Sequence, residues 1–471
     1  MKVLEVKVEN VYSVLSDYTA ALEESLTVTY QNYWFSSRYR SGLWDGKHHF
    51  LKFPSLKFPT GLLFLVKEYC ICNDITLTIY DNRQVPDTEI PLITDASILQ
   101  GITLRSYQIE ATNQALKEKR GVIELPTASG KTEVAASIIK QLGLRTLFLV
   151  HTKDLLHQTI ERFEKRLQRS VGCVGDGILD VNDKSIIVAT VQSVSSLLNK
   201  RETETKRFLN SFQLFFQDEV HHSSAQEWTR IGNLMTNAYY RFGLSGTILR
   251  RDELSNMKML ALFGSPIYRK KASELAALGF LAPIEIRIVD NPEIIMADDY
   301  QQMYAKGIVQ SVCRNTLIAN LAEKQYKESK KVLVLVRHIE HGEILAHTIT
   351  HDYDVPALFL SGKDDSEIRN ESKKRFDSVD GLILISSPIW DEGVDVPQIN
   401  VLINASGGKS EWKTIQKIGR GLRIKSDGSK LIVYDFADRG KFLQKHSKER
   451  AAIYEREGFE VIWESKKGET L

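Results

Sequence analysis

The sequence predicts an α/β protein in which two parallel sheets follow one another along the chain, preceded by a small α/β domain. Short apolar runs alternate with amphipathic segments, a pattern typical of buried parallel strands covered by helices on both faces. These runs fall into two groups, separated by a polar stretch near residues 291–300. We therefore expect three domains, over residues 1–95, 96–285 and 286–471.

Each expected strand is a short apolar run between helical patterns. In the first sheet the runs lie at residues 122–123, 146–150, 186–189, 214–216 and 242–244. In the second sheet they lie at residues 332–336, 357–360, 382–385, 401–403 and 431–434. The segment before about residue 95 lacks this pattern and is rich in Tyr, Trp and Phe interleaved with Arg, Lys and Gly. It is expected to fold separately.

The composition limits the class of protein. A chain of 471 residues with 42% hydrophobic residues can bury more than one core. Its net charge of +2 means that any nucleic-acid site must be a local basic surface. The four cysteines are too scattered for a disulfide framework, a zinc site or an iron–sulfur cluster, which favours a reduced cytoplasmic protein. Without a membrane-length apolar run or the features of a signal peptide, we expect a soluble, non-secreted protein with no membrane partner.

Residues 124–132 have the composition of a phosphate-binding loop. They follow an apolar run and end in Gly130-Lys131-Thr132, although Leu125 stands where the usual pattern has its first glycine. Backbone N–H groups in such a turn, followed by a helix N-terminus, make a concave anion site. Lys131 can then reach the β- and γ-phosphates, and the Thr132 hydroxyl can ligate Mg²⁺. The candidate phosphate-binding residues are Pro126, Thr127, Ala128, Ser129, Gly130, Lys131 and Thr132.

An acidic pair, Asp218 and Glu219, follows the apolar run at 214–216. Two carboxylates at the end of a buried strand are what Mg²⁺ and an attacking water require. The loop and the acidic pair together indicate a nucleoside triphosphatase.

Polar residues also follow the other expected strands, where open parallel sheets bind their ligands. Taken singly, a hydroxyl-rich strand end is more often a helix cap than a ligand site. Their order along the chain is more informative. These segments are residues 151–155, 189–193, 245–247, 361–362 and 386–397, and residues 416–423 on a later helix.

In this order the segments resemble the motifs of the superfamily 2 helicases and translocases. The resemblance begins at Leu104 and continues to the end of the second sheet. It implies two RecA-like lobes with ATP and Mg²⁺ between them. In the first lobe it implies that Arg105 and Gln108 contact the adenine and that Lys131 binds the phosphates. Thr132 and Asp218 would hold Mg²⁺, and Glu219 would polarise the attacking water. His221 would link the ATP site to Ser245 and Thr247. A helix cap is the alternative for Gln108.

The second lobe is expected to complete the nucleotide site. Arg423 is the predicted arginine finger and Arg420 its neighbour on the γ-phosphate, because charge developing on the transferred group needs cations. The resemblance also directs Gly393, Asp395 and Gln416 towards ATP. Hydrolysis would then depend on lobe closure.

The same resemblance predicts a track for the backbone of one nucleic-acid strand. Contacts to phosphate and sugar carry no sequence information, which suits a motor that moves along any sequence. Lys153 has the alternative interpretation of a solvated surface lysine. The expected track residues are Thr152, Lys153, Gly175, Thr190 and Gln192 in the first lobe and Arg337, His338, Ser361 and Gly362 in the second.

Residues 33–47, followed by residues 59–62, are similar to the accessory domain of the UvsW-type phage helicases, which remodel branched DNA. The resemblance implies a duplex-binding surface that includes Arg38, Arg40 and Lys47. The alternatives are an ordinary solvated face for the cations and a domain core for Trp34, Trp44 and Phe50. For Trp44 we favour a packed turn.

These observations predict an ATP-dependent DNA helicase or translocase that acts on branched or forked DNA and on single-stranded DNA. A monomer is expected, in the host cytoplasm if the chain is phage-encoded. Two alternatives remain: an RNA-directed motor, and a scaffold in which nucleotide only tightens the grip on DNA. Lys131, Glu219 and Arg423 argue against the scaffold, which has no use for a water-activating carboxylate and a finger.

Overall fold

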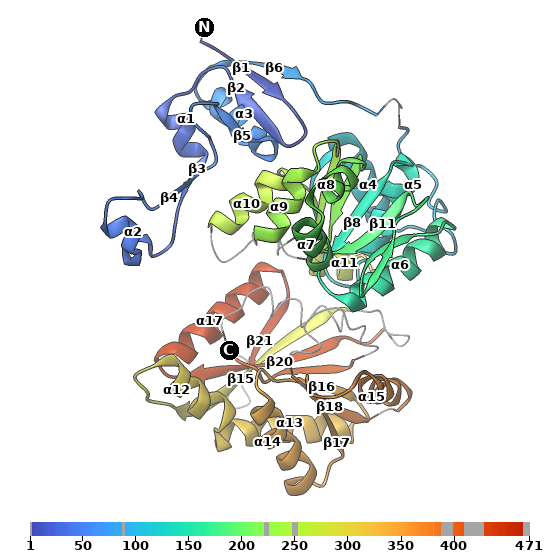
Figure 1. Cartoon of the computed structure of the whole chain (residues 1–471). Coiled ribbons are helices and arrows are strands. Elements are labelled where there is room, and N and C mark those ends of the chain that lie inside the picture. Colours follow the sequence, from blue (N-terminus) through green and yellow to red (C-terminus); the bar gives the residue numbers. More distant parts are fainter. Residues whose placement is uncertain are drawn as a thin grey trace. The chain divides into compact units, whose positions relative to one another are not determined.

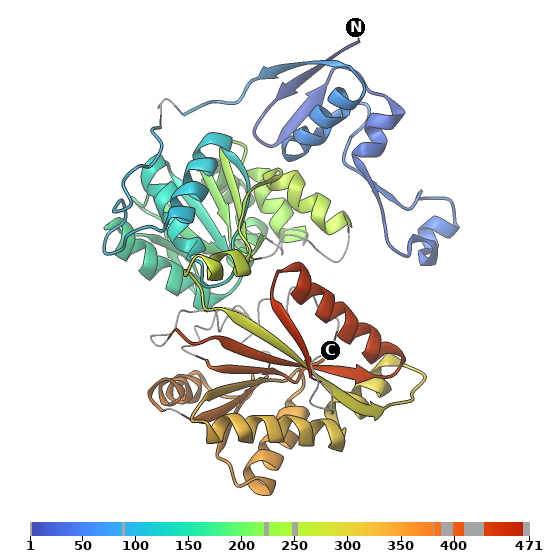
Figure 2. The same ribbon diagram turned by 180° about the vertical axis from the view of Figure 1, so that it is seen from behind.

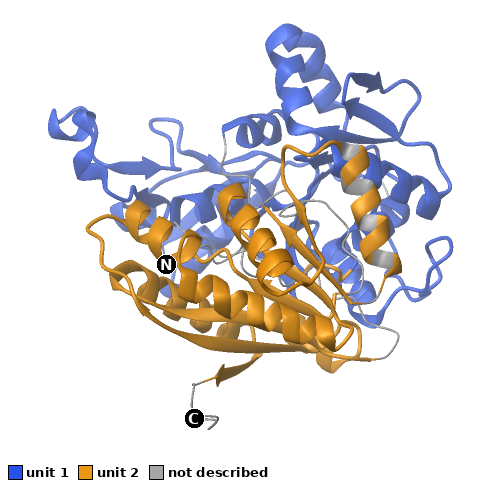
Figure 3. Ribbon diagram, turned by 90° about the horizontal axis from the view of Figure 1, so that it is seen from below, with its two compact units in different colours: residues 1–125, 130–269 blue, residues 126–129, 270–471 orange. Residues whose placement is uncertain are grey.

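The computed structural model describes the chain in two compact units (Figure 3). The first unit comprises residues 1–125 and 130–269, and the second comprises residues 126–129 and 270–471. The residues described are 2–86, 90–220, 226–246, 253–379, 381–387, 399–408 and 428–464.

The first unit begins with an N-terminal module built on a four-stranded mixed sheet of order β5-β2-β1-β6 (Figure 1). Alternate residues of β1 are buried, and they pack with Val66 and Cys70 of α3 in one core. A two-stranded hairpin, β3–β4, extends from this sheet and carries α2 at its outer end (Figures 1 and 2). The elements are β1 (Val3–Val8), β2 (Tyr12–Leu15), α1 (Ala20–Ser25), β3 (Thr27–Thr29), η1 (Tyr33–Phe35), α2 (Ser37–Arg40), β4 (Lys47–His49), β5 (Lys57–Pro59), η2 (Thr60–Leu62), α3 (Leu63–Cys72) and β6 (Thr76–Asp81).

The first lobe follows as an eight-stranded sheet of order β10-β9-β11-β8-β12-β13-β7-β14. Its strands are parallel except for the antiparallel pair β10–β9. Every residue of β8, β11 and β12 is buried, as expected when helices cover both faces of a parallel sheet. The elements are α4 (Ser106–Glu118), β7 (Arg120–Glu124), α5 (Lys131–Leu142), β8 (Thr146–Val150), α6 (Lys153–Leu167), β9 (Gly172–Gly175), β10 (Ile178–Asp180), β11 (Ile186–Thr190), α7 (Val191–Lys200), α8 (Glu202–Asn210), β12 (Leu214–Gln217), α9 (Gln226–Leu234), β13 (Tyr240–Ser245), α10 (Glu253–Phe263) and β14 (Pro266–Arg269).

The N-terminal module packs on helix α10 of this lobe. Met257 of α10 belongs to the same buried cluster as Phe58 and Leu62 of the module. Gly61 lies so close to α10 that a Cβ atom there would come within 2.1 Å of the Leu260 carbonyl oxygen, so only glycine fits. The Asn10 side-chain amide also donates to the Thr236 carbonyl at 3.0 Å. The module and the lobe therefore share a core.

The second unit is built on a seven-stranded sheet of order β17-β18-β16-β19-β20-β15-β21, in which all the paired strands are parallel. Its central strands β16, β18 and β19 are buried throughout. The elements are α11 (Ala272–Ala277), β15 (Ile284–Ile294), α12 (Tyr300–Tyr304), the π-helical turn η4 (Ala305–Val309), α13 (Val312–Lys327), β16 (Lys331–Leu335), α14 (Ile339–His347), the π-helical turn η5 (Thr348–Asp352), β17 (Ala357–Leu360), α15 (Ser366–Ser378), β18 (Leu382–Ser386), β19 (Val401–Asn404), β20 (Leu431–Arg439), α17 (Lys441–Arg456) and β21 (Glu460–Glu464).

The predicted fold class, tandem parallel-sheet lobes preceded by a small α/β module, is confirmed. Every strand expected in the two parallel sheets is present, and the sheets contain further strands that the apolar runs did not indicate. These are β9, β10, β14, β15 and β21. The expected boundaries near residues 95 and 285 stay predictions, since the N-terminal module and the first lobe form one compact unit.

Among the described residues, no helix combines the length and the apolar character needed to cross a membrane. All four cysteines carry free thiols, and those of Cys70 and Cys173 are buried.

Candidate nucleotide site and nucleic-acid track

The candidate phosphate-binding residues form the loop between β7 and α5. Ala128 and Gly130 have left-handed backbones, with φ of 64° and 81°, and Gly130 is the N-cap of α5. The Ser129 hydroxyl donates to the Pro126 carbonyl at 2.6 Å and holds the turn closed. The next N–H groups, which begin with that of Lys131, lie in the first turn of α5, where a helix offers no internal acceptor. A turn of this kind leading into a helix is suited to an anion.

Leu125 enters the loop as a strand residue. It is fully buried, and its N–H donates to the Ser245 carbonyl at 2.9 Å, so the position extends the pairing of β7 with β13. This accounts for a leucine where the usual pattern has glycine. The Lys131 ammonium donates to the Leu125 carbonyl at 3.2 Å, which folds the side chain back over the loop.

Gln108 supports the loop from the neighbouring helix. Its side-chain oxygen accepts from the Arg105 N–H at 2.9 Å, which caps α4. Its amide nitrogen lies 2.5 Å from the position that a Cβ atom of residue 130 would occupy, so Gly130 permits this approach. The cap considered as the alternative for Gln108 is thus present. The predicted adenine contacts of Arg105 and Gln108 stay predictions.

Asp218 and Glu219 lie at the carboxyl end of β12, between β8 and β13. The Glu219 N–H donates to the Asp218 carboxylate at 2.9 Å. Burial, together with the neighbouring Glu219 charge, raises the pKa of Asp218 to about 6, although Lys131 opposes the shift. A crowded carboxylate with a raised pKa, such as Asp218, fits a divalent cation, which would lower that pKa again. Mg²⁺ held by Asp218 and Thr132 would stabilise charge on the phosphates.

Several predicted residues lie outside the described part of the chain. They are His221, Thr247, Gly393, Asp395, Gln416, Arg420 and Arg423. Their roles stay predictions.

The five track residues of the first lobe come together at the carboxyl ends of three adjacent strands, β9, β11 and β8. Gly175 ends β9, and a Cβ atom there would lie 3.2 Å from the Thr190 methyl group. The Gln192 amide donates to the His151 carbonyl at 3.2 Å and joins the ends of β11 and β8. Thr152 and Thr190 also cap α6 and α7.

Lys153 is 70% exposed, and its ammonium lies 2.6 Å from the Asp176 carboxylate. This ion pair agrees with the alternative of a solvated surface lysine. A phosphate at this point would have to compete with Asp176 for the ammonium.

The track residues of the second lobe lie at two strand ends. Arg337 and His338 follow β16 and flank Tyr304, with the guanidinium carbon 5.5 Å and the imidazole centroid 5.3 Å from the phenol ring. Burial lowers the pKa of His338 below its usual value. Ser361 and Gly362 follow β17, which is separated from β16 by β18. The two groups therefore share an edge of the sheet but are about 10 Å apart, two strand spacings.

The predicted duplex-binding cations lie on the outer part of the β3–β4 hairpin, which we call the arm (residues 30–47). Arg38, Arg40 and Lys47 are exposed there. The Trp44 indole donates to the Lys47 carbonyl at 2.9 Å and packs edge-on against Tyr30, in agreement with the structural interpretation of Trp44. Trp34 is exposed, so it does not belong to the module's core.

Two protein-family models match the chain. Residues 101–250 match the family described as type III restriction enzyme, res subunit, and residues 313–425 match the helicase conserved C-terminal domain. The chain belongs to the superfamily 2 helicases. It is therefore an ATP hydrolase of the helicase class, and the matched segments contain the phosphate loop, the acidic pair and the predicted finger.

Individual proteins are also similar to this helicase. It is 28% identical to the DNA 3'-5' translocase XPB2 of Sulfurisphaera tokodaii over 78% of this chain and 87% of the relative. It is 27% identical to the ATP-dependent DNA helicase uvsW of Enterobacteria phage T4 over 86% of this chain and 84% of the relative. A fragment of a putative HsdR subunit of a type I restriction enzyme from Vibrio vulnificus shares the fold, with a TM-score of 0.57, 20% identity and coverage of 91% of this chain and 78% of that one.

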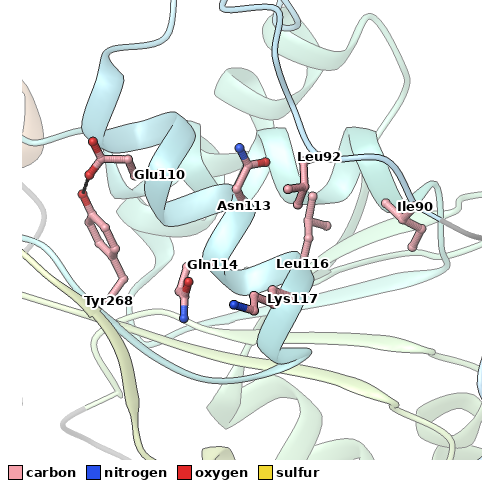
Figure 4. Close-up of a pocket in the computed structure, with 8 residues that line it drawn as sticks. All are labelled: Ile90, Leu92, Glu110, Asn113, Gln114, Leu116, Lys117 and Tyr268. Carbon is pink, nitrogen blue, oxygen red and sulfur yellow. Dashed lines mark hydrogen bonds between the residues drawn. The ribbon is translucent and has the colours of Figure 1, made fainter.

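A surface pocket of about 570 Å³ lies elsewhere on the first lobe of the helicase (Figure 4). Tyr268 closes one side of it by donating its hydroxyl to the Glu110 carboxylate at 2.8 Å. None of the predicted nucleotide or track residues contributes to its lining. The lining residues are Ile90, Leu92, Glu110, Asn113, Gln114, Leu116, Lys117 and Tyr268.

Two buried arginines of the helicase were not predicted from the sequence. Arg314 and Arg450 are almost completely buried in the second lobe, and each donates to a backbone carbonyl of the segment after β19, at Ala405 and Gly408 respectively. No motif marks them, because an arginine in an amphipathic helix normally indicates a solvated face. Buried arginines that donate to backbone carbonyls indicate instead that they hold the segment after β19 in place.

Proposed function

We propose that this helicase uses ATP to unwind or branch-migrate forked and four-way DNA in recombination, repair or replication. Its membership of the ATP-dependent DNA helicases and translocases supplies the general activity. The basic arm supports the action on branched DNA, because the arm belongs to a module that shares its core with a motor lobe. A duplex-gripping element fixed to a motor can hold one arm of a branch while a strand is drawn away.

In this proposal the chemistry is phosphoryl transfer to water. Lys131 and the N–H groups of the loop bind the β- and γ-phosphates of ATP. Glu219 accepts the proton of the attacking water. Arg423 and Arg420 supply cations from the second lobe, so turnover depends on both lobes. Gly393, Asp395 and Gln416 would face the nucleotide, and His221 would relay its state to Ser245.

The proposed track binds one strand by its backbone. Helix N-termini, such as that of α7 after Thr190, offer N–H groups to phosphates. Gly175 makes room for Leu156, whose Cδ2 atom would lie 2.6 Å from a Cβ atom at that position. Arg337 and His338 would provide the corresponding contacts in the second lobe. Because such contacts are independent of sequence, the two groups suit stepping along any strand.

The names of the relatives support DNA as the substrate. One is called a DNA 3'-5' translocase and another an ATP-dependent DNA helicase. We therefore extend the proposal to 3'-5' movement. The expectation of a monomer is kept as a separate part of the proposal. Duplexes with only a 3' or only a 5' single-stranded tail test the polarity, and faster unwinding of the 5'-tailed substrate would contradict it.

The main test compares ATP turnover with single-stranded, duplex, forked and four-way DNA and with RNA of the same sequence. We expect the strongest stimulation by forked or four-way DNA, together with strand separation or branch migration. Stronger stimulation by RNA would support the RNA motor instead. Tight DNA binding with nucleotide but without turnover would support the scaffold.

A further inference from the structure

The arm contains two kinds of aromatic side chain. The first kind holds the arm together. Tyr30 packs on Trp44 with ring centroids 4.9 Å apart, and Tyr33 packs on Tyr39 at 4.6 Å. A Cβ atom at residue 46 would lie 2.5 Å from the Tyr33 ring, so this ring covers the glycine of the turn. These half-buried aromatics pack in pairs within the arm.

The second kind remains exposed. Trp34 is 51% exposed and Phe35 is 71% exposed, and the nearby Leu43 is 75% exposed. The Trp34 ring packs edge-on against Tyr33 at 5.3 Å, but the exposed parts of these adjacent large apolar side chains gain no stability from folding, since burial is what makes such residues stabilising. Grouped exposed apolar residues indicate an interaction site.

Hydrogen bonds close the turn that carries these two rings. The Phe35 N–H donates to the Asn32 carbonyl at 3.1 Å, and the Phe35 carbonyl accepts from the Arg40 guanidinium at 3.1 Å. The base of the arm is closed by the Tyr30 N–H, which donates to the Gly46 carbonyl at 2.9 Å. The backbone that carries Trp34 and Phe35 is therefore already folded, so less of it needs to be ordered on binding.

The surroundings of the rings are cationic. The arm contains three cations, Arg38, Arg40 and Lys47, and one carboxylate, Asp45. That carboxylate is occupied by His49 at 2.7 Å and by the Lys47 N–H at 3.0 Å. A binding partner should therefore combine flat apolar faces with negative charge. Nucleic acid with unpaired bases has both, and duplex DNA exposes base faces only at an end or a branch.

We propose that Trp34 and Phe35 stack on bases exposed at the branch point of DNA. This inference rests on the proposed function and deepens it, since it assigns the arm to the junction rather than to uniform duplex. The cations bind the adjoining phosphates, and the rings stabilise bases that are no longer paired. In Figures 1 and 2 the arm projects away from the four-stranded sheet of its module. The exposed fractions of Trp34 and Phe35 show that both rings are accessible.

The test uses the full chain and forked DNA with 2-aminopurine at the junction. Replacing both rings, Trp34→Ala with Phe35→Ala, should lower the affinity for the fork roughly 10-fold or more, as expected when stacking is removed. The change in 2-aminopurine fluorescence on binding should disappear as well. ATP turnover at saturating single-stranded DNA should stay unchanged, because the phosphate loop and the acidic pair lie in the first lobe and not in the arm. Trp34→Phe should keep most of the affinity, because an aromatic face is retained.

Ile71→Ala is the matched control, since Ile71 is 78% exposed on α3 of the same module. It should leave fork binding unchanged. The inference is overturned if the double variant binds the fork and changes its fluorescence like the wild type. It is also overturned if the variant loses affinity equally for covalently closed circular duplex, which has neither an end nor a branch. A wild-type protein with no preference for forked DNA would contradict the proposed function itself, and the inference with it.

Discussion

Arg450 and Asp435 form a buried ion pair in the second lobe, with both side chains 2% exposed. Two guanidinium nitrogens of Arg450 contact the carboxylate at 2.8 and 2.9 Å, and a third donates to the Gly408 carbonyl at 2.8 Å. Burial alone would raise the pKa of Asp435, but the Arg450 charge and the hydrogen bonds from Arg450 and Tyr454 lower it. The ion pair thus fixes the chain directly before residues 409–427, where the predicted finger lies.

Arg450→Ala should strongly destabilise the second lobe. It leaves the Asp435 carboxylate buried without its cation, which typically costs about 3–5 kcal/mol. The midpoint of chemical denaturation measures the effect. Arg439→Ala is the control, because Arg439 is 43% exposed and pairs with Asp290 at the surface, where a pair contributes no more than about 1 kcal/mol. Equal shifts for the two variants would contradict a structural role for the buried pair.

Glu219→Gln should retain ATP and DNA binding and lower turnover by a factor on the order of 10² or more, because an amide does not accept the proton of water. Steady-state ATP hydrolysis and nucleotide binding measure the two effects separately. Glu227→Gln on the exposed start of α9 is the control and should keep normal turnover. Turnover close to wild type in the Glu219 variant would rule out this residue as the base.

Arg423→Ala should leave ATP affinity within a few-fold and reduce turnover by roughly 10³, as expected for a finger supplied within the same chain. Lysine should not replace it, because it lacks the planar fork that binds two phosphate oxygens. Single-turnover hydrolysis at saturating ATP makes the measurement. Normal hydrolysis by Arg423→Lys would show that a two-pronged phosphate contact is not required.

The core of each sheet could be predicted from the sequence because buried parallel strands are continuous apolar runs. The strands that were missed lack this signal for physical reasons. Residues Ile178 and Leu179 of β10 are exposed at the edge of the sheet, and β9 both begins and ends with glycine. In β15 polar residues interrupt the apolar run, and one of them, Glu285, makes ion pairs with Arg287 and Lys430.

The positions of the loop after β7 and of the acidic pair after β12 could likewise be predicted, since nucleotide chemistry requires particular residue types at strand ends, while the roles of these residues stay predictions. The structure adds what spacing does not contain. The contact of Gln108 with Gly130 joins two helices. The hydrogen bond from Arg450 to the Gly408 carbonyl joins α17 to the segment after β19, 42 positions earlier. A fully buried Gln217, whose side-chain amide has no hydrogen-bond partner within the described residues, also precedes the acidic pair without any sequence signal.

The buried His341 should make stability depend on pH. Burial, followed by the nearby Arg314 charge, lowers its pKa to about 3, and its ring contacts the Asn315 side-chain oxygen at 3.0 Å. Below the ordinary pKa of about 6.5, the unfolded chain takes up a proton that the folded one does not. The free energy of unfolding should therefore fall by up to about 1.4 kcal/mol for each unit by which the pH is lowered between about 6.5 and 3.

Chemical denaturation at several pH values between 7.5 and 5 measures the slope of the free energy of unfolding against pH. His341→Gln should remove the contribution of His341 to this slope. The exposed His347 on the same helix supplies the control, since His347→Gln should leave the wild-type slope in place. An unchanged slope in the His341 variant would contradict the assignment.

Charge reversal on the arm tests whether the N-terminal module grips duplex DNA. Deleting the module would uncover Met257 and its neighbours on α10, so substitutions in the full chain are the better experiment. Arg38→Glu with Arg40→Glu should weaken binding to forked and four-way DNA and lower the log–log salt slope by about one for each phosphate that the arm no longer binds. Hydrolysis with single-stranded DNA should continue, because the loop and the acidic pair lie in the first lobe.

Lys67→Glu on α3 is the control for a change of charge in the same module. If the arm variant processes junctions as fast as the wild type with the same salt slope, the arm does not bind DNA. If Lys67→Glu weakens binding equally, the effect comes from the overall field of the module and not from phosphates bound by the arm.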